Sequence, residues 1–206
     1  INAVSIRYAE EILTPEFGQG MDKLLLKRKA DVYGIINGID YTVYNPKFDQ
    51  FIWEHYDWNS LNRKRKNKAE LQKLVKLERR PDIPVIGMVH RLTEQKGFDL
   101  IMEAMPWILK LPVQLVVVGT GFKGYVDFFR KMAKKYPSKV GLFTPFTDKL
   151  ASRVYAGSDM FLMPSRYEPC GISQLISMRY GSIPIVHETG GLMETITNFN
   201  PKRETG

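Results

Sequence analysis

The sequence contains very little of what metal sites and disulfide frameworks require. Among its 206 residues, Cys170 is the single cysteine, which excludes an internal disulfide and a paired-cysteine metal site. The three histidines, His55, His90 and His187, lie far apart and show no metal-ligand spacing. We therefore expect neither a disulfide nor a bound metal.

Long apolar runs and a signal peptide are also missing. No run reaches the roughly 18 residues that a membrane-spanning helix needs, so we expect no membrane contact. The chain begins at Ile1 rather than Met and stops at Gly206 without a closing element, so we expect a fragment of a longer protein. A single, reduced cysteine favours the cytoplasm.

Basic residues outnumber acidic ones by 30 to 22, which gives a net charge of +8. Much of the excess lies in three runs, at 23–29, 63–68 and 73–80, within helix-like segments rich in Asn, Glu and Gln. We interpret these runs as solvated helical faces rather than a nucleic-acid surface. The same balance suits a diphosphate-bearing substrate or a polyhydroxylated polymer.

The residue pattern divides the chain into three parts. Residues 1–38 mix short strand-like and helical stretches with a turn-rich loop. The pattern of residues 39–83 indicates a crossover between two domains, with a polar helical stretch at 49–80. In residues 84–206, strands alternate with helices, and the run Val113–Val118 is typical of a strand buried on both faces. This alternation predicts an α/β fold built on a Rossmann-like, doubly wound parallel sheet.

Two basic side chains follow the first strand of this sheet, at the edge where open α/β sheets bind ligands. Dinucleotide-binding folds carry glycines there, whereas this chain has Arg91 and, five residues on, Lys96. Arginine pairs with a diphosphate through two parallel hydrogen bonds, and lysine adds a point charge. Solvated surface charge is the ordinary alternative, but the position favours phosphate binding.

Two further loops at this edge carry candidate ligand-binding residues. Phe146 follows the short strand Val140–Phe143 and is able to stack on a base, although most such aromatics belong to a core. Thr189, Gly190 and Gly191 follow the last strand and open a helix. They fit a phosphate nest, which is compatible with an ordinary helix cap.

The most informative stretch is 165–171, between a strand at 160–163 and a helical segment. Three alternative roles are open to the Glu168 carboxylate at this position: a nucleophile, a general acid, or a hydrogen-bond partner for hydroxyls. The paired carboxylates of a glycosidase need a second acid at a defined separation, and no spacing favours one. Backbone amides from Gly171 onward are placed for an anion. Cys170 has no histidine evidently placed to activate it, so a packing or ligand-lining thiol is favoured.

Taken together, Arg91–Gly97, Pro164–Gly171 and Thr189–Leu192 resemble the bacterial glycogen synthase and plant starch synthase family, glycosyltransferase family 5. Asn37–Asp40 and Tyr180–Pro184 fit it too, so the resemblance covers essentially the whole chain. It implies a retaining transferase of GT-B fold, in which two Rossmann-like domains face each other across a cleft. This chain would be the C-terminal, nucleotide-sugar-binding half, truncated at its end and preceded by the tail of the acceptor-side domain.

The resemblance also implies the reaction. Such enzymes move glucose from ADP-glucose to the 4-hydroxyl at the non-reducing end of an α-1,4-glucan. By resemblance, Arg91 and Lys96 hold the diphosphate and stabilise the charge that develops as it leaves, and Glu168 binds hydroxyls of the donor glucose. The other residues implied at the donor site are Phe146 against adenine, Cys170, Gly171 and Ile172 beside the sugar, and Thr189, Gly190 and Gly191 against phosphate and sugar. Retention is expected by front-face attack, with no metal or other cofactor.

Some positions depart from the wider pattern. Ile176 stands where related retaining transferases repeat a glutamate, which supports the synthase branch, while His187 and Glu188 replace common arginines. The acceptor-side motifs of the N-terminal domain are absent, so we expect the glucan to bind mainly outside this chain and the chain alone to be inactive. The alternatives are a transferase using UDP-glucose or another acceptor, and a non-catalytic nucleotide-binding module. A plant-like parent would reside in a plastid.

Overall fold

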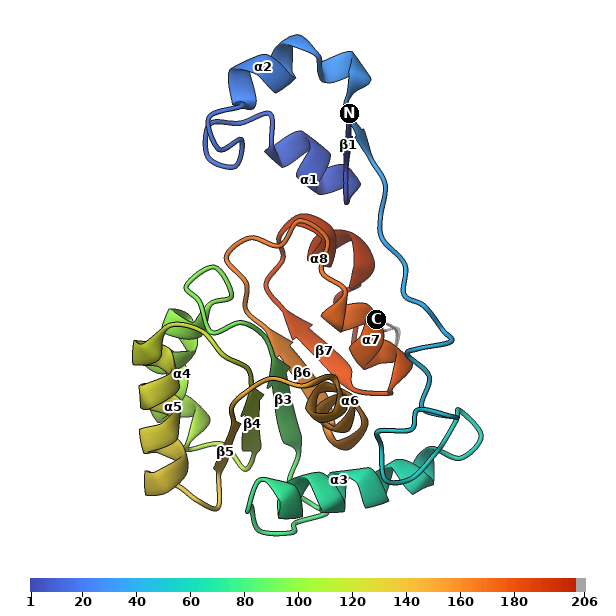
Figure 1. Ribbon diagram of the computed structural model, residues 1–206, viewed down its shortest axis with the longest axis vertical. Coiled ribbons are helices and arrows are strands. Elements are labelled where there is room, and N and C mark those ends of the chain that lie inside the picture. Colours follow the sequence, from blue (N-terminus) through green and yellow to red (C-terminus); the bar gives the residue numbers. More distant parts are fainter. Residues whose placement is uncertain (203–206) are drawn as a thin grey trace.

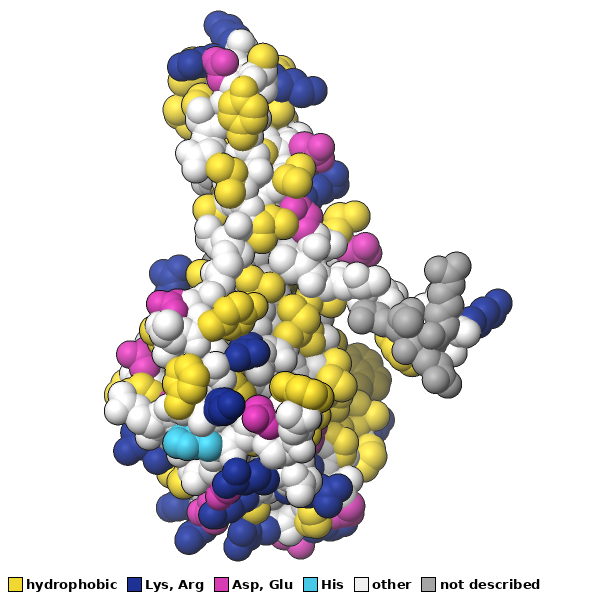
Figure 2. Space-filling view, turned by 90° about the vertical axis from the view of Figure 1, so that its right-hand side faces the viewer, with side chains coloured by type: hydrophobic (Ala, Val, Ile, Leu, Met, Phe, Trp, Pro, Cys, Tyr) yellow, Lys and Arg dark blue, Asp and Glu magenta, His cyan; other side chains and the backbone are white. Residues whose placement is uncertain are grey.

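The computed structural model describes residues 1–202, which form a small lobe and a larger sheet domain (Figure 1). The lobe holds a two-stranded parallel sheet and short helices, namely β1 (Asn2–Ala3), α1 (Ile6–Glu11), α2 (Asp22–Lys27), η1 (Lys29–Asp31) and β2 (Tyr33–Gly34). An extended segment then runs from the lobe past the sheet domain. Figure 2 shows the lobe as a narrow extension above the broader domain.

Five parallel strands form the main sheet in the order β5-β4-β3-β6-β7. They are β3 (Val85–Val89), β4 (Gln114–Val118), β5 (Val140–Phe143), β6 (Met160–Met163) and β7 (Ile183–Val186). The chain winds outward from β3 to β5 and then returns to add β6 and β7 on the other side of β3. The doubly wound parallel sheet expected from the sequence is thereby confirmed. The carboxyl ends of β3 and β6 are neighbours where the winding reverses, which is where such sheets bind ligands.

Helices cover both faces of the sheet. On one face lie α4 (Phe98–Ile108) and α5 (Lys123–Lys135), and on the other lie α3 (Lys64–Leu74), α6 (Asp148–Gly157) and α7 (Ser173–Arg179). The short helix η2 (Leu61–Arg63) precedes α3 and contacts it. The last helix, α8 (Gly190–Thr195), contacts α1 of the lobe. Within residues 1–202, no helix has the length and apolar character to cross a membrane. The proposed boundaries at 38 and 83 stay predictions.

Alternation along the central strands places one core on each side of the sheet. Val85 and Val89 of β3 belong to the cluster under α3, α6 and α7, whereas Ile86 and Met88 belong to the cluster under α4 and α5. Successive side chains of a strand point to opposite faces, so one apolar run supplies both cores. This packing holds the strand ends, and therefore the loops that follow them, in fixed positions.

The helical stretch predicted at 49–80 is wrong at both ends, because helical structure covers only 61–74 of it. Asn45, Asp49 and Asp57 each accept a hydrogen bond from the amide two residues on, at 3.1, 2.8 and 3.1 Å. Such side chains offer the backbone an alternative to helical hydrogen bonds and favour turns. The short helix η2 at 61–63 leads into α3, which begins at Lys64, and residues 49–60 fold as turns and bends.

The basic run at the start of α3 is only partly a solvated face. Lys64 Nζ donates to the carbonyls of Tyr155 and Ala156 at 3.1 and 2.7 Å, and burial lowers the pKa of Lys64 to about 7. Lys68 Nζ pairs with Asp159 at 2.8 Å. Other cations gather at the lower end of the molecule, where α3 lies (Figure 2). The two inward lysines attach α3 to the C-terminal end of α6 and to the start of β6.

The core under α4 and α5 offers a direct stability test. Phe98 is completely buried and meets Phe129 edge to face at a centroid distance of 5.6 Å. We expect Phe98→Ala to lower the free energy of unfolding by about 3–5 kcal/mol, because it removes buried area and leaves a cavity. Trp107→Ala on the same helix, where the side chain is 66% exposed, should change it by less than about 0.5 kcal/mol. Urea unfolding measures both, and equal losses would contradict this assignment of the core.

Candidate functional site

The loops that follow β3 and β6 are joined by an ion pair. Lys96 Nζ lies 2.5 Å from Glu168 Oε2, and the hydroxyl of Ser165 donates to the same oxygen at 3.0 Å. The side chains of Lys96 and Glu168 are only 16% and 8% exposed. The sequence suggested separate roles for these two residues, whereas the structure places them in direct contact.

Backbone contacts hold these two loops against each other. Gly97 has a left-handed conformation, with φ of +71°, and a Cβ at this position would lie 2.1 Å from the carbonyl oxygen of Pro164. A glycine is required there for both reasons. Arg166 N donates to the carbonyl of Gln95 at 2.9 Å, and Gln95 Nε2 donates to the carbonyl of Tyr167 at 3.0 Å. The two loops that carry the ion pair are therefore also held together by contacts outside the pair.

His90 directly follows the last residue of β3. Its Nε2 lies 3.3 Å from the carbonyl oxygen of Leu162, which assigns the ring proton to Nε2. Burial, and then the nearby charge of Lys96, lower the pKa of His90 to about 3. The imidazole is therefore neutral near pH 7 and serves as a packed, hydrogen-bonded support for the loop that carries Arg91.

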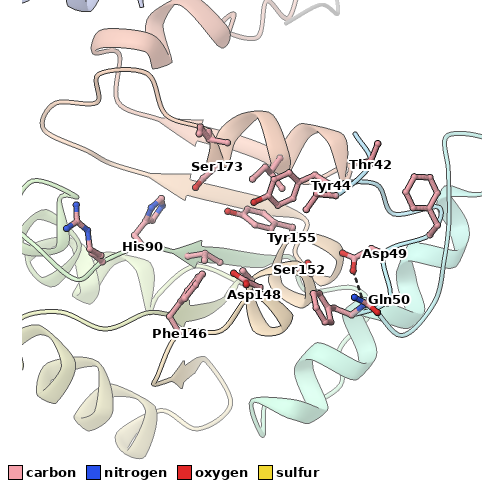
Figure 3. A pocket seen from close by; sticks show the side chains of 18 of the residues that line it. Thr42, Tyr44, Asp49, Gln50, His90, Phe146, Asp148, Ser152, Tyr155 and Ser173 are labelled. Atoms are coloured by element: carbon pink, nitrogen blue, oxygen red, sulfur yellow. Dashed lines mark hydrogen bonds between the residues drawn. The ribbon is translucent and has the colours of Figure 1, made fainter. Parts of the chain in front are cut away.

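A cleft of about 860 Å³ opens beyond the carboxyl ends of β3, β4 and β5 (Figure 3). Of the residues proposed from the sequence, Arg91, Phe146 and Ile172 line it. Phe146 is 45% exposed, so its ring belongs to the cleft wall rather than to a core. A cleft of this size, at the reversal point of the sheet, suits a nucleotide-sized ligand.

The facing wall of the cleft comes from the crossover segment at 42–51, which the sequence did not indicate as part of a site. Asp49 in this wall is 6% exposed and accepts a hydrogen bond from the Tyr180 hydroxyl at 2.6 Å. The Tyr56 hydroxyl donates to the carbonyl of Tyr180 at 2.8 Å. These contacts fasten the crossover to the end of α7. The only signal for such a wall was the turn chemistry around Asn45 and Asp49.

The two helix starts proposed for anion binding differ in the structure. At α8, Gly190 N donates to Glu11 Oε1 at 3.3 Å, and Gly191 N donates to the carbonyl of Glu168 at 3.0 Å. A Cβ on Gly190 would lie 2.0 Å from that same carbonyl oxygen. These glycines therefore permit close packing on the Glu168 loop, and their amides have protein acceptors. The donor contacts proposed for Thr189, Gly190 and Gly191 stay predictions.

At α7 the corresponding amides face the cleft. Ile172 and Ser173 both line it, and within residues 1–202 no hydrogen bond uses their backbone N–H groups. Gly171, just before them, has a φ of +70° that turns the chain into the helix. An anion in the cleft would find unused donors here rather than at α8.

Cys170 is a packing residue in this structure. It is 3% exposed, and burial raises the pKa of its thiol. His187, the nearest candidate base by sequence, instead bonds through Nδ1 to the carbonyl of Ser165 at 2.9 Å. This arrangement agrees with the expectation that the thiol packs or lines a ligand site.

No group of three or more His, Cys, Asp or Glu side chains in residues 1–202 is arranged to hold a metal ion. The expectation that the reaction needs no cofactor stays a prediction.

Fold and site together define a doubly wound α/β domain with charged side chains at its ligand-binding edge. The family model for glycosyl transferases group 1 matches residues 70–206, and the chain belongs to this family. Within it, the chain is related to the glycogen and starch synthases. It is 48% identical over all 206 residues to glycogen synthase from Pseudothermotoga lettingae, and 52% identical over 200 residues, 97% of this chain, to glycogen synthase from Clostridium novyi. The resemblance inferred from the sequence is confirmed.

A solved structure supports the same relationship. The catalytic domain of starch synthase IV from Arabidopsis thaliana, bound to ADP and acarbose, superposes with a TM-score of 0.89 at 35% identity. The superposition covers 97% of this chain and 41% of that one. The chain spans 42% of the length of both glycogen synthases. The similarity therefore concerns one part of a larger enzyme.

The neutral state of His90 predicts a pH dependence of stability. The folded protein holds this imidazole unprotonated down to a pKa of about 3, whereas the unfolded chain binds a proton near pH 6.5. The stabilisation is complete above pH 6.5 and is lost as the pH falls toward 3, at up to about 1.4 kcal/mol per pH unit. Urea unfolding from pH 8 to pH 4 should show a shallower decline for His90→Asn than for the native chain. Identical declines below pH 6.5 would contradict the buried neutral imidazole; above pH 7 the slopes should coincide.

Proposed function

We propose that this chain is the donor-binding part of a glycogen or starch synthase. The parent enzyme would transfer glucose from ADP-glucose to the non-reducing 4-hydroxyl of an α-1,4-glucan, with retention of configuration. The observation that carries the proposal is the placement of Arg91 beside the cleft and of the Lys96–Glu168 pair at the reversal point of the sheet. Relatives named glycogen synthase, and the relative bound to ADP and acarbose, support this choice of substrates.

In the proposed complex the diphosphate lies near Arg91 and Lys96. Lys96 is already paired with Glu168, so the incoming phosphate supplies a second anion for the same ammonium group. The two cations then stabilise the negative charge that grows on the departing diphosphate, which is electrostatic stabilisation of a leaving group. Phe146 offers an aromatic face for the base.

Glu168 takes the sugar-directed role in this proposal. Its Oε2 is held by Lys96 and Ser165, which fixes the carboxylate and lets it accept hydrogen bonds from glucose hydroxyls. A carboxylate engaged with an ammonium and a hydroxyl is a weak nucleophile, so attack by the acceptor on the same face as the leaving group is favoured. The departing phosphate oxygen then takes the proton of the acceptor hydroxyl.

This chain would bind the donor, while turnover would require the parent enzyme. In the proposed complex, the donor sugar contacts Cys170, Gly171 and Ile172. We propose a cytoplasmic location, or a plastid for a plant parent. A donor carrying UDP is the principal alternative within the family.

Phosphate binding by Arg91 and Lys96 is tested by calorimetry with ADP, UDP and ADP-glucose. We expect Arg91→Ala and Lys96→Ala each to weaken ADP binding by about 1.5–3 kcal/mol, because each removes a charge-assisted hydrogen bond. Arg65→Ala, an exposed cation on α3, serves as the matched control and should leave ADP affinity unchanged. Unchanged ADP affinity in both test variants would refute the phosphate assignment, and tighter binding of UDP would favour the alternative donor.

The role of Glu168 is tested in the parent enzyme. We expect Glu168→Ala to lower glucosyl transfer more than it lowers ADP binding, because the carboxylate contacts sugar rather than phosphate. Glucosyl transfer from ADP-glucose and ADP affinity are measured on the same preparation. A Ser165→Ala variant, which removes one hydrogen bond to the carboxylate, should show a smaller loss of the same kind. Equal losses of transfer and of ADP affinity would count against a sugar-directed role.

A further inference from the structure

A second hollow, of about 560 Å³, lies where the N-terminal lobe meets the sheet domain. Three aromatic side chains from separate segments line it: Tyr8 from α1, Phe17 from the loop between α1 and α2, and Tyr167 from the loop after β6. That α1–α2 loop lies on the side of the molecule where α4 and α5 lie (Figure 1). The hollow is distinct from the 860 Å³ cleft, because the two have no lining residue in common.

The aromatic rings are held in place but are not buried in a core. Phe17 and Tyr167 meet edge to face at 6.5 Å, which leaves ring faces for a ligand, and Tyr167 is 36% exposed. The backbone of Tyr167 is fixed by Gln95, as described above. Beside Phe17, Gln19 has a φ of +50°, a conformation that non-glycine residues adopt at a cost and that recurs at ligand sites.

The polar lining suits a neutral ligand with many hydroxyls. Arg166 is already paired with Asp99, so its charge is compensated. His187 uses Nδ1 for the carbonyl of Ser165, which leaves Nε2 for a ligand. Glu16 and Gln19 add acceptors and a donor at the rim. A phosphate would meet a compensated cation and a carboxylate, and an apolar ligand would leave these polar groups unpaired.

We propose that this hollow is a saccharide-binding subsite that takes glucosyl units of the α-glucan acceptor. The C–H faces of a pyranose ring carry partial positive charge and pack on the negative faces of aromatic rings, while its hydroxyls bond to the polar rim. The hollow adjoins the proposed reaction centre, because Tyr167 precedes Glu168, and Ser165 joins His187 to the Glu168 carboxylate. This inference rests on the proposed function for the identity of the glucan, and it places part of the acceptor site within this chain.

The test is calorimetric titration of the chain with maltohexaose and, separately, with ADP. We expect Phe17→Ala and Tyr167→Ala each to weaken maltohexaose binding about tenfold, the effect of truncating an aromatic anchor. Phe17→Ala should leave ADP affinity unchanged, because Phe17 does not line the cleft. Tyr33→Ala, an exposed tyrosine of the same lobe, is the matched control and should leave both affinities unchanged. Adenosine is titrated as a competitor that also stacks on aromatic rings.

The results that test the saccharide subsite are distinguishable from those that test the donor site. Unchanged maltohexaose affinity in Phe17→Ala, or no binding by the native chain at millimolar concentrations, overturns the subsite even where ADP binds normally. Displacement of maltohexaose by adenosine also overturns it, because the hollow would then be a nucleoside site. Loss of maltohexaose binding in Phe17→Ala with normal ADP binding supports the subsite. Failure of Arg91→Ala to affect ADP binding would count against the donor assignment alone.

Discussion

Lys96 and Glu168 form a nearly buried ion pair that joins the loops following β3 and β6. A buried charge that loses its partner costs several kcal/mol, so these loops separate only if another group takes over the contact. In the proposed complex the donor supplies such groups, since its phosphates are anions for Lys96 and its sugar hydroxyls are donors for Glu168. The pair keeps both side chains ordered without the donor, and in the proposed complex it places them near the bond that breaks.

The same loop also anchors the N-terminal lobe. The Ser5 hydroxyl donates to the carbonyl of Pro169 at 2.6 Å, and the Glu11 carboxylate accepts from Gly190 N at the start of α8. The cleft, the saccharide subsite and the lobe contact therefore all adjoin one short stretch, residues 165–172. Small movements of the lobe would shift Glu168, because packed contacts transmit displacement rather than absorb it.

Much of the fold was predictable because local pattern and tertiary structure agree. The strands at 85–89, 140–143, 160–163 and 183–186 match the sequence prediction, since short apolar runs between turn signals have few other solutions. The segment at 49–60 was mispredicted because its polar composition resembles a helix, while its side chains cap turns. The cleft wall at 42–51 overlaps this segment, and it depends on the contact of Asp49 with Tyr180, more than a hundred residues away, which no local pattern reports.

The sequence by itself determined the alternation of strands and helices, the family, and the presence of Arg91, Lys96 and Glu168 in the segments that follow two of the strands. It did so because side-chain periodicity and short motifs are local properties of the chain. Only the tertiary structure decided which of these residues touch. In the folded chain Lys96 pairs with Glu168, the amide of Gly190 donates to Glu11, and a second hollow lies beside Tyr167. Such contacts depend on how distant segments pack, and packing is set by the whole core rather than by any one stretch.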